Sequence, residues 1–375
     1  MVSNAHRPAR LPPRHDCVVR EASVATLAPP SATLNPAEKA GAPGADITQS
    51  ERNRCNPDAG GRPVLEVSDL EISTTGPRET PLLETLSLEI RDGEFFALVG
   101  ESGSGKSLLC SALMGILPAN LRATGDVLFD GKPLANADRS ARAMIFQQPN
   151  RYLNPVRTIG FQLAETVAIV SNLRKREARD RAASLLDAVG IDDPRATLKK
   201  YPHELSGGMN QRVMMALALA RQPRLLIADE PTSALDVTTQ RQIMDLIERL
   251  RDDWNMAVLF VTHDLDLAVE RSDRIGVIYA GQLVEIGPTR ALAGQPRHPY
   301  TRTLFSAVPA ISLAPPKLAA LAGGVPDPSL RGNGCHFASR CSSALDNCKR
   351  IRPTFATDVS HTAACHNLGG SDATF

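Results

Sequence analysis

Hydrophobic residues along the chain change their spacing in a way that separates strands from helices. Residues 64–72 (VLEVSDLEI) and 85–90 (TLSLEI) alternate apolar and polar positions, which predicts two strands. An unbroken apolar run at 95–100 and two mainly apolar runs at 224–229 and 257–263 are typical of buried strands. Because helical patterns lie between these runs, the sequence predicts an α/β fold with a mostly parallel sheet covered on both faces.

The intervening segments carry helix and turn signals. A helix is expected over residues 106–117, and residues 125–134 predict a hairpin that turns at Asp130 and Gly131. Residues 150–222 should be mainly helical, with Gly190 ending one helix. A later helix presents an apolar face, and two short strands should follow Arg274, at 275–280 and 281–287. The apolar face consists of Ile243, Leu246, Ile247 and Leu250.

Composition divides the chain into three parts. Residues 1–62 are rich in Ala and Pro and hold no aromatic residue, since the first in the chain is Phe95. Such a segment cannot bury enough apolar surface to offset its ordering entropy, so we expect it to be disordered. A folded domain is expected over 63–310, with residues 150–222 as a helical subdomain. Residues 311–375 would form a cysteine-bearing extension.

Charge and hydropathy limit the classes of protein to which this chain can belong. The chain has 42 basic and 41 acidic residues, so its charge balance does not indicate a nucleic-acid-binding protein. No apolar run reaches the roughly 18–20 residues that cross a bilayer. The first 20 residues lack the apolar core of a secretory signal. We therefore expect a protein that neither spans a membrane nor is secreted.

The segment GESGSGKS supplies the first chemistry. Gly100, Glu101, Ser102, Gly103, Ser104, Gly105, Lys106 and Ser107 match the phosphate-binding P-loop pattern. The motif follows a predicted strand and opens a predicted helix, which is the context that the pattern requires. Backbone N–H groups and the helix N-terminus would attract phosphate. Lys106 would reach the β- and γ-phosphates of a nucleotide, and Ser107 would bind Mg²⁺.

Two acids at the end of a later strand complete this chemistry. Residues 225–230 (LLIADE) place Asp229 where it can hold Mg²⁺, directly or through water. Glu230 would then lie beside the γ-phosphate, where the attacking water needs a general base. The P-loop and the acidic strand end together predict a nucleotide-hydrolysing enzyme.

The segment between these motifs resembles the signature of the ATP-binding cassette (ABC) ATPases. It reads LSGGMNQR over residues 205–212 and precedes an apolar helix. Other family motifs follow in order, with Gln147 resembling the Q-loop glutamine and residues 233–236 (SALD) the D-loop. His263 resembles the switch histidine. The resemblance covers about 64–310 and implies ATP and Mg²⁺ as cofactors. It also implies a P-loop NTPase fold with a mixed sheet and a helical subdomain.

The resemblance further implies that the active unit is a head-to-tail dimer. In that family Ser206, Gly207 and Gly208 would close over the γ-phosphate of ATP bound by the P-loop of a partner, either a sister ATPase or a second copy. Gln147 would sense Mg²⁺ and the attacking water. His263 would contact the γ-phosphate beside Glu230.

The adenine site departs from the family pattern. Family members usually stack adenine on an aromatic residue, but the matching position is near Thr74, and no aromatic residue lies between Val64 and Arg91. Ring stacking contributes roughly 1–3 kcal/mol per base. We therefore expect weaker or less base-selective nucleotide binding than in members with the aromatic ring.

Two features after the cassette resemble the ATPases of oligopeptide, dipeptide and nickel importers. Residues 295–304 (QPRHPYTRTL) match their extension. Clustered cysteines in a cytosolic protein favour a metal site over disulfides, and their wide spacing favours a [4Fe-4S] cluster, with zinc as the alternative. Nearby His336, His361 and His366 keep a mixed zinc site open. The cysteines are Cys335, Cys341, Cys348 and Cys365.

The sequence therefore predicts the ATP-hydrolysing subunit of an ABC importer for peptides or a related solute such as nickel. The resemblance implies two membrane permease subunits, a separate solute-binding protein and a peripheral position at the cytoplasmic face of the inner membrane. It implies no nucleic-acid partner. Two alternatives are a non-transport ABC ATPase acting in translation or on DNA, and a subunit of a phosphonate-cleaving complex.

Overall fold

The computed structural model describes residues 62–233, 235–306, 323–355 and 360–368. The expectation of a disordered N-terminal segment concerns residues that lie outside this range, apart from Arg62. The same holds for Ala234 of the D-loop segment. No helix in the described ranges is long and apolar enough to cross a membrane.

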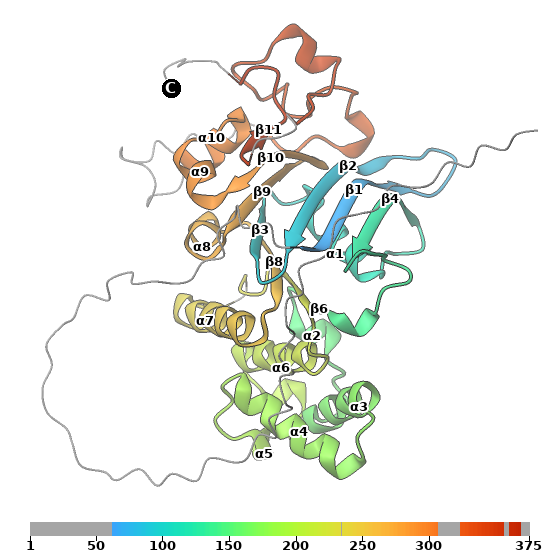
Figure 1. The fold of residues 1–375 in the computed structure, drawn as a ribbon, viewed down its shortest axis with the longest axis vertical. Coiled ribbons are helices and arrows are strands. Elements are labelled where there is room, and N and C mark those ends of the chain that lie inside the picture. The colour runs from blue at the N-terminus through green and yellow to red at the C-terminus, as the bar shows by residue number, and fades with distance from the viewer. Residues whose placement is uncertain (1–61, 234, 307–322, 356–359, 369–375) are drawn as a thin grey trace, which may run out of the picture. The chain divides into compact units, whose positions relative to one another are not determined.

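A seven-stranded sheet forms the centre of the fold (Figure 1), in the order β11-β10-β9-β3-β8-β7-β6. The five strands from β9 to β6 run parallel, while β10 and β11 are antiparallel to their neighbours. The fold is therefore a mixed sheet with a parallel centre, as the sequence predicts. The strands are β3 (Phe95–Val99), β6 (Arg142–Ile145), β7 (Leu225–Asp229), β8 (Ala257–Thr262), β9 (Arg274–Tyr279), β10 (Gln282–Pro288) and β11 (Thr362–Ala363).

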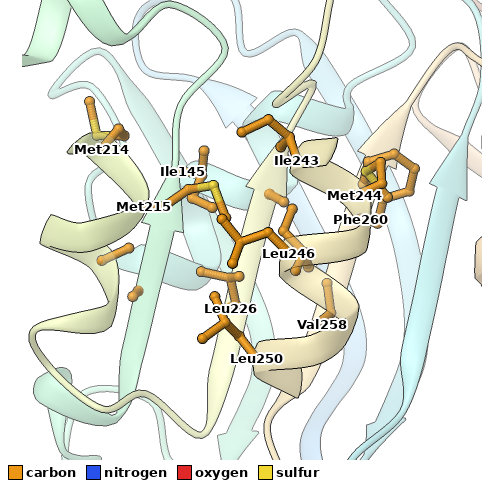
Figure 2. Packing of buried hydrophobic residues seen from close by; sticks show 14 of the residues in the cluster. Ile145, Met214, Met215, Leu226, Ile243, Met244, Leu246, Leu250, Val258 and Phe260 are labelled. Atoms are coloured by element: carbon orange, nitrogen blue, oxygen red, sulfur yellow. The ribbon is translucent and has the colours of Figure 1, made fainter. Parts of the chain in front are cut away.

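Both faces of the parallel strands are buried, which explains why their sequences are continuously apolar. In β3, Phe95 and Ala97 belong to one core cluster and Phe96 and Leu98 to the other. Helices α6 (Gly207–Leu219) and α7 (Val237–Trp254) contribute to the first cluster, where their side chains meet those of β6, β7 and β8 (Figure 2). Helix α1 (Lys106–Met114) contributes to the second.

A second, antiparallel sheet shares the α1 side of the core. Its order is β2-β1-β4-β5, and Leu65 and Leu83 from it belong to the same cluster as Leu109 of α1. Its last turn confirms the predicted hairpin, since Phe129 pairs with Lys132 and the two turn residues have positive φ. The strands are β1 (Pro63–Thr74), β2 (Pro81–Arg91), β4 (Leu121–Phe129) and β5 (Lys132–Pro133).

The segment predicted to be mainly helical contains five helices. One of them ends as expected, because Gly190 lies just beyond Ala188 with φ 74° and donates its N–H to the Asp187 carbonyl. Four further helices follow β7. The helices not yet given are α2 (Pro149–Tyr152), α3 (Ile159–Ser171), α4 (Lys175–Ala188), α5 (Pro194–Thr197), α8 (Leu265–Arg271), α9 (Thr289–Gly294) and α10 (Pro299–Ser306).

Two strands of the main sheet were not predicted. Strand β6 is four residues long and begins with a charged residue, Arg142, which is buried because its guanidinium donates to the Leu113 carbonyl. Strand β11 has only two residues, and it adds the C-terminal extension to the edge of β10. Neither segment is long enough to show a hydrophobic period, so tertiary pairing alone defines them.

The core between α7 and the sheet allows a stability test. Leu246 is 4% exposed and points from α7 toward the strands (Figure 2). Leu246→Ala should lower the free energy of unfolding by about 2–5 kcal/mol, because it removes buried methyl groups and leaves a cavity. Urea unfolding of the full chain measures the change. Val237→Ala, at an exposed position of the same helix, is the control and should have a far smaller effect; equal losses would contradict this packing.

Candidate functional site

The P-loop lies between β3 and α1 and is tightly packed at its start. A Cβ on Gly100 would lie 2.1 Å from the Ile278 carbonyl oxygen, so no larger residue fits there. Gly105 reaches the left-handed region with φ 105° and turns the chain into α1. Ser102 and Gly103 are exposed, whereas Ser104 and Lys106 are buried. The loop thus offers the N-terminus of α1 as a phosphate site.

The Lys106 ammonium is held over this loop by main-chain oxygens. Its Nζ donates to the carbonyls of Gly100 at 2.7 Å and Glu101 at 3.0 Å. Burial lowers the pKa of Lys106, and the nearby carboxylates of Glu230 and Asp229 act in the opposite direction. The buried ammonium would attract a polyanionic phosphate, whereas the two carboxylates would repel it unless a cation lay between them.

Asp229 and Ser107 meet opposite Lys106 and fit the chemistry of a divalent cation. Burial raises the pKa of Asp229, and a hydrogen bond from Ser107 opposes this rise. The Oδ1 atom of Asp229 is buried without a hydrogen-bond partner, as is the Oγ of Ser104. An orphaned carboxylate oxygen beside a serine hydroxyl forms a set of hard oxygen ligands, which suits Mg²⁺.

Glu230 contacts two side chains that are distant from it in the sequence. The Gln147 amide donates to Glu230 Oε2 at 2.7 Å, and the Nδ1 of His263 lies 3.3 Å from Glu230 Oε1. Glu230 itself has φ 46°, a strained conformation for a residue with a side chain. Strain of this kind persists where the surrounding structure holds the residue in a required orientation. The structure thus brings together the three residues that the sequence proposes for catalysis.

These groups come from four neighbouring strands of the central sheet. The P-loop follows β3, His263 follows β8, Asp229 and Glu230 end β7, and Gln147 follows β6. Because the strands are parallel, their carboxyl ends meet at one edge, where ligands of open α/β sheets bind.

The signature segment takes no part in this cluster. The Ser206 hydroxyl caps α6 by accepting the Met209 N–H, and Ser206 and Gly207 are exposed. The D-loop residue Asp236 likewise caps α7 through the Thr239 N–H. Each segment therefore presents a helix N-terminus at the surface.

Comparison with known proteins identifies the family. Residues 83–233 match the ABC transporter family, and residues 284–348 match the C-terminal region of oligopeptide/dipeptide transporters. The dipeptide transport ATP-binding protein DppD of Escherichia coli is 45% identical over 77% of this chain and 92% of its own length. A putative peptide import ATP-binding protein of Brucella melitensis is 42% identical over 81% of this chain and 94% of its own.

The chain belongs to the ABC transporter ATP-binding family.

Solved structures of ABC cassettes share its fold. The cbiO1 protein of Clostridium perfringens, part of an ABC transporter complex, is 28% identical with a TM-score of 0.53 over 61% of this chain and 90% of its own. The dimeric cassette MJ0796 gives the same identity and TM-score over 60% of this chain and 99% of its own. The predicted P-loop NTPase fold is therefore confirmed, and the chain is an ATP-hydrolysing enzyme of this family that uses ATP and Mg²⁺.

The adenine-side segment of this ABC ATPase contains no aromatic side chain. Thr74 ends β1, and its hydroxyl accepts the Thr80 N–H at 3.0 Å, closing the turn between β1 and β2. The strand forms as the sequence predicts, so the missing ring is a property of the sequence and not of a different local fold.

The four C-terminal cysteines line one small pocket, together with His298, Phe337 and His366. All four are free thiols. Within the described part of the chain, however, no group of three or more His, Cys, Asp or Glu side chains is arranged to hold a metal ion. The structure therefore does not confirm the metal site that the sequence predicts. Two of the histidines considered for zinc are engaged elsewhere, since His361 contacts Glu285 and His336 contacts the Ala280 carbonyl.

Two residues that contact the P-loop were missed in the sequence. The Tyr300 hydroxyl accepts the N–H of Glu101, and the Arg340 guanidinium binds the Glu101 carboxylate. Tyr300 belongs to residues 295–304, whose local pattern indicates only a turn and a short helix. Arg340 lies between two cysteines, and nothing in the local pattern indicates a contact 239 residues away.

Because position 74 has no aromatic ring, a substitution that introduces one is predicted to increase the affinity for nucleotide. Thr74→Tyr should tighten ATP binding by about five- to 100-fold, which corresponds to the stacking energy of one base. Equilibrium binding of ATP to the purified full chain measures it. Thr124→Tyr, at an exposed position of β4, is the control and should leave the affinity unchanged. An unchanged affinity in Thr74→Tyr would remove stacking as the missing contribution.

Proposed function

We propose that this chain is the ATP-hydrolysing subunit of an importer of dipeptides or oligopeptides. The observation that carries the proposal is the pairing of an ATP site with a C-terminal extension of the oligopeptide/dipeptide transporter type. The relatives with 40–45% identity are named for dipeptide transport or peptide import. The proposed division is a cassette over 63–310 with its helical subdomain at about 150–222, followed by an extension over 311–375.

Glu230 acts as the general base in this proposal. Its carboxylate takes a proton from water as the water oxygen bonds to the γ-phosphorus, while the bond from that phosphorus to the β-phosphate oxygen breaks and ADP leaves. Gln147 and His263 orient the carboxylate through the two contacts described above. The residues 100–107 bind the phosphates, and Lys106 neutralises their charge. Ser107 and Asp229 would hold Mg²⁺, which supplies further charge neutralisation when bound.

A head-to-tail dimer completes each ATP site. Ser206, Gly207 and Gly208 at the start of α6 would bind the γ-phosphate of ATP held by the partner's P-loop. What supports this is the exposure of Ser206 and Gly207 at the N-terminus of α6. The solved cassette MJ0796 is a dimer. The partner here is a sister ATPase or a second copy of the chain.

A groove beside Gln147 suits a permease subunit. It lies between α2, the start of α3 and α6, and Tyr152 and Phe161 expose 56% and 44% of their surface there. Phe146, next to Gln147, stacks on Tyr152 with ring centroids 3.7 Å apart, so Tyr152 links the groove to the Gln147 segment. We propose that a cytoplasmic segment of one membrane permease occupies this groove, so that the two grooves of the assembled dimer bind two permeases. The chain would then lie at the cytoplasmic face of the inner membrane, with a separate solute-binding protein supplying the peptide.

The cysteine pocket supports a [4Fe-4S] cluster as a further part of this proposal. Each of the four sulfurs accepts a backbone N–H, from Phe337, Ser343, Leu345 and Asn367 respectively. Such hydrogen bonds stabilise cysteine sulfur as a metal ligand. The four thiols line one shared pocket. The cluster would hold the extension together and would be bound by Cys335, Cys341, Cys348 and Cys365.

Glu230→Gln tests the catalytic assignment. ATP turnover should fall by about 10²–10⁴-fold, the usual contribution of a general base, while ATP binding persists and the dimer stays closed. Phosphate release and size-exclusion chromatography with ATP measure the two effects. Asp126→Asn, an exposed carboxylate changed to an amide in β4, is the control. Retained turnover in Glu230→Gln would refute the base assignment.

Peptide import itself is tested in proteoliposomes that contain this chain, its permeases and its binding protein. Labelled dipeptide should enter only with ATP and only when Glu230 is intact. If ATP is hydrolysed and nickel enters the vesicles but the dipeptide does not, the transported solute is nickel and not a peptide. Stimulation by ribosomes or DNA instead would overturn the importer assignment.

The metal is tested by anaerobic purification of the full chain. A [4Fe-4S] cluster should give a brown protein with equal amounts of iron and acid-labile sulfide, and Cys341→Ser should lower both. Ser342→Ala, at an exposed position of the same loop outside the pocket lining, is the control. A colourless protein with stoichiometric zinc would exclude the cluster, and a metal-free protein would exclude both.

A further inference from the structure

The C-terminal extension reaches the ATP site through one arginine. Arg340 lies in the loop between Cys335 and Cys341, and its two terminal nitrogens donate to the two carboxylate oxygens of Glu101 at 2.9 and 3.3 Å. Glu101 is the second residue of the P-loop. This two-pronged geometry fixes the direction of the carboxylate as well as its distance.

The pair is shielded and supported on the arginine side. The Arg340 side chain is 7% exposed and that of Glu101 25%. Arg340 also donates to the Tyr279 hydroxyl at 3.0 Å, and its guanidinium lies 5.6 Å from the Tyr279 ring centre and 5.9 Å from that of Phe337. Ionic contacts with little solvent access are screened far less than surface pairs. Arg340 therefore has little freedom to move away from Glu101.

Residues that follow β10 in the chain hold both the side chain and the main chain of Glu101. Its N–H donates to the Tyr300 hydroxyl at 3.0 Å, and Tyr300 packs against Tyr279 and Phe337 with ring centroids 4.7 and 5.4 Å apart. The Glu101 carbonyl in turn accepts a hydrogen bond from Lys106. One residue thus joins the extension to the lysine that binds phosphate.

We propose that Arg340 is a positioning residue for ATP binding, which acts by fixing Glu101 and with it the first turn of the P-loop. The inference rests on the ATP site of the ABC cassette and not on peptide import. Arg340 directly precedes Cys341, so the cysteine-bearing loop is a structural part of the ATP site. Displacement of this loop therefore changes nucleotide affinity.

Arg340→Met in the full chain tests the contact. The Kd for MgATP should rise by about five- to 50-fold, within the range usual for coupled sites, because the P-loop must then be ordered by ATP itself. The kcat should change less. Arg340→Lys keeps the charge but not the two-pronged geometry, so its Kd should lie between those of the native chain and Arg340→Met. Arg350→Met, at an exposed position of the same extension, should leave the Kd unchanged.

A double-mutant cycle separates positioning from a general loss of structure. Glu101→Gln should also raise the Kd, and the double variant should bind ATP no more weakly than the worse single variant, because both remove the same contact. Urea midpoints of all variants report whether the fold itself is weakened. An unchanged Kd in Arg340→Met, additive effects in the cycle, or a lower urea midpoint with unchanged Kd would overturn the proposal. These readouts do not depend on the solute, so they are independent of the importer assignment.

Discussion

The central interaction of this molecule is the placement of one buried cation near two carboxylates. Lys106 begins α1, just after β3, and Asp229 and Glu230 lie at the end of β7, with β8 between the two strands. Lys106 and Asp229 are buried, so each gains by binding a partner of the opposite charge. A triphosphate with its cation supplies both charges at once. The parallel sheet is the device that brings these groups to one edge.

The order of strands explains why residues so distant in the sequence form a single site. Gln147 and His263 approach Glu230 because β6 and β8 flank β7 on its two sides. The strands that position these residues are buried on both faces, so their sequences are continuously apolar. Glu230 adopts a strained backbone conformation at the point where these neighbours converge.

The extension has a larger structural role than its composition indicates. Its described residues form little regular secondary structure, yet it contributes β11 to the main sheet and buries Phe337 against Tyr279 and Tyr300. A buried carboxylate anchors it. Burial alone would raise the pKa of Glu285, but hydrogen bonds from His361 and from the N–H groups of Arg297 and His298 hold it below its usual value. The cassette and the extension are therefore joined by buried polar contacts that need exact partners.

The sequence by itself determined the features that depend on local patterns. The strand–P-loop–helix unit, the acidic strand end and the hairpin at Asp130 were predictable because glycine spacing and hydrophobic period act over a few residues. Tertiary structure alone decided the pairing of β6 and β11, the meeting of Gln147 with Glu230, and the contact of Arg340 with Glu101. These depend on strand order and on chain segments brought together from up to 239 residues apart, and short sequence patterns carry no information about such distances.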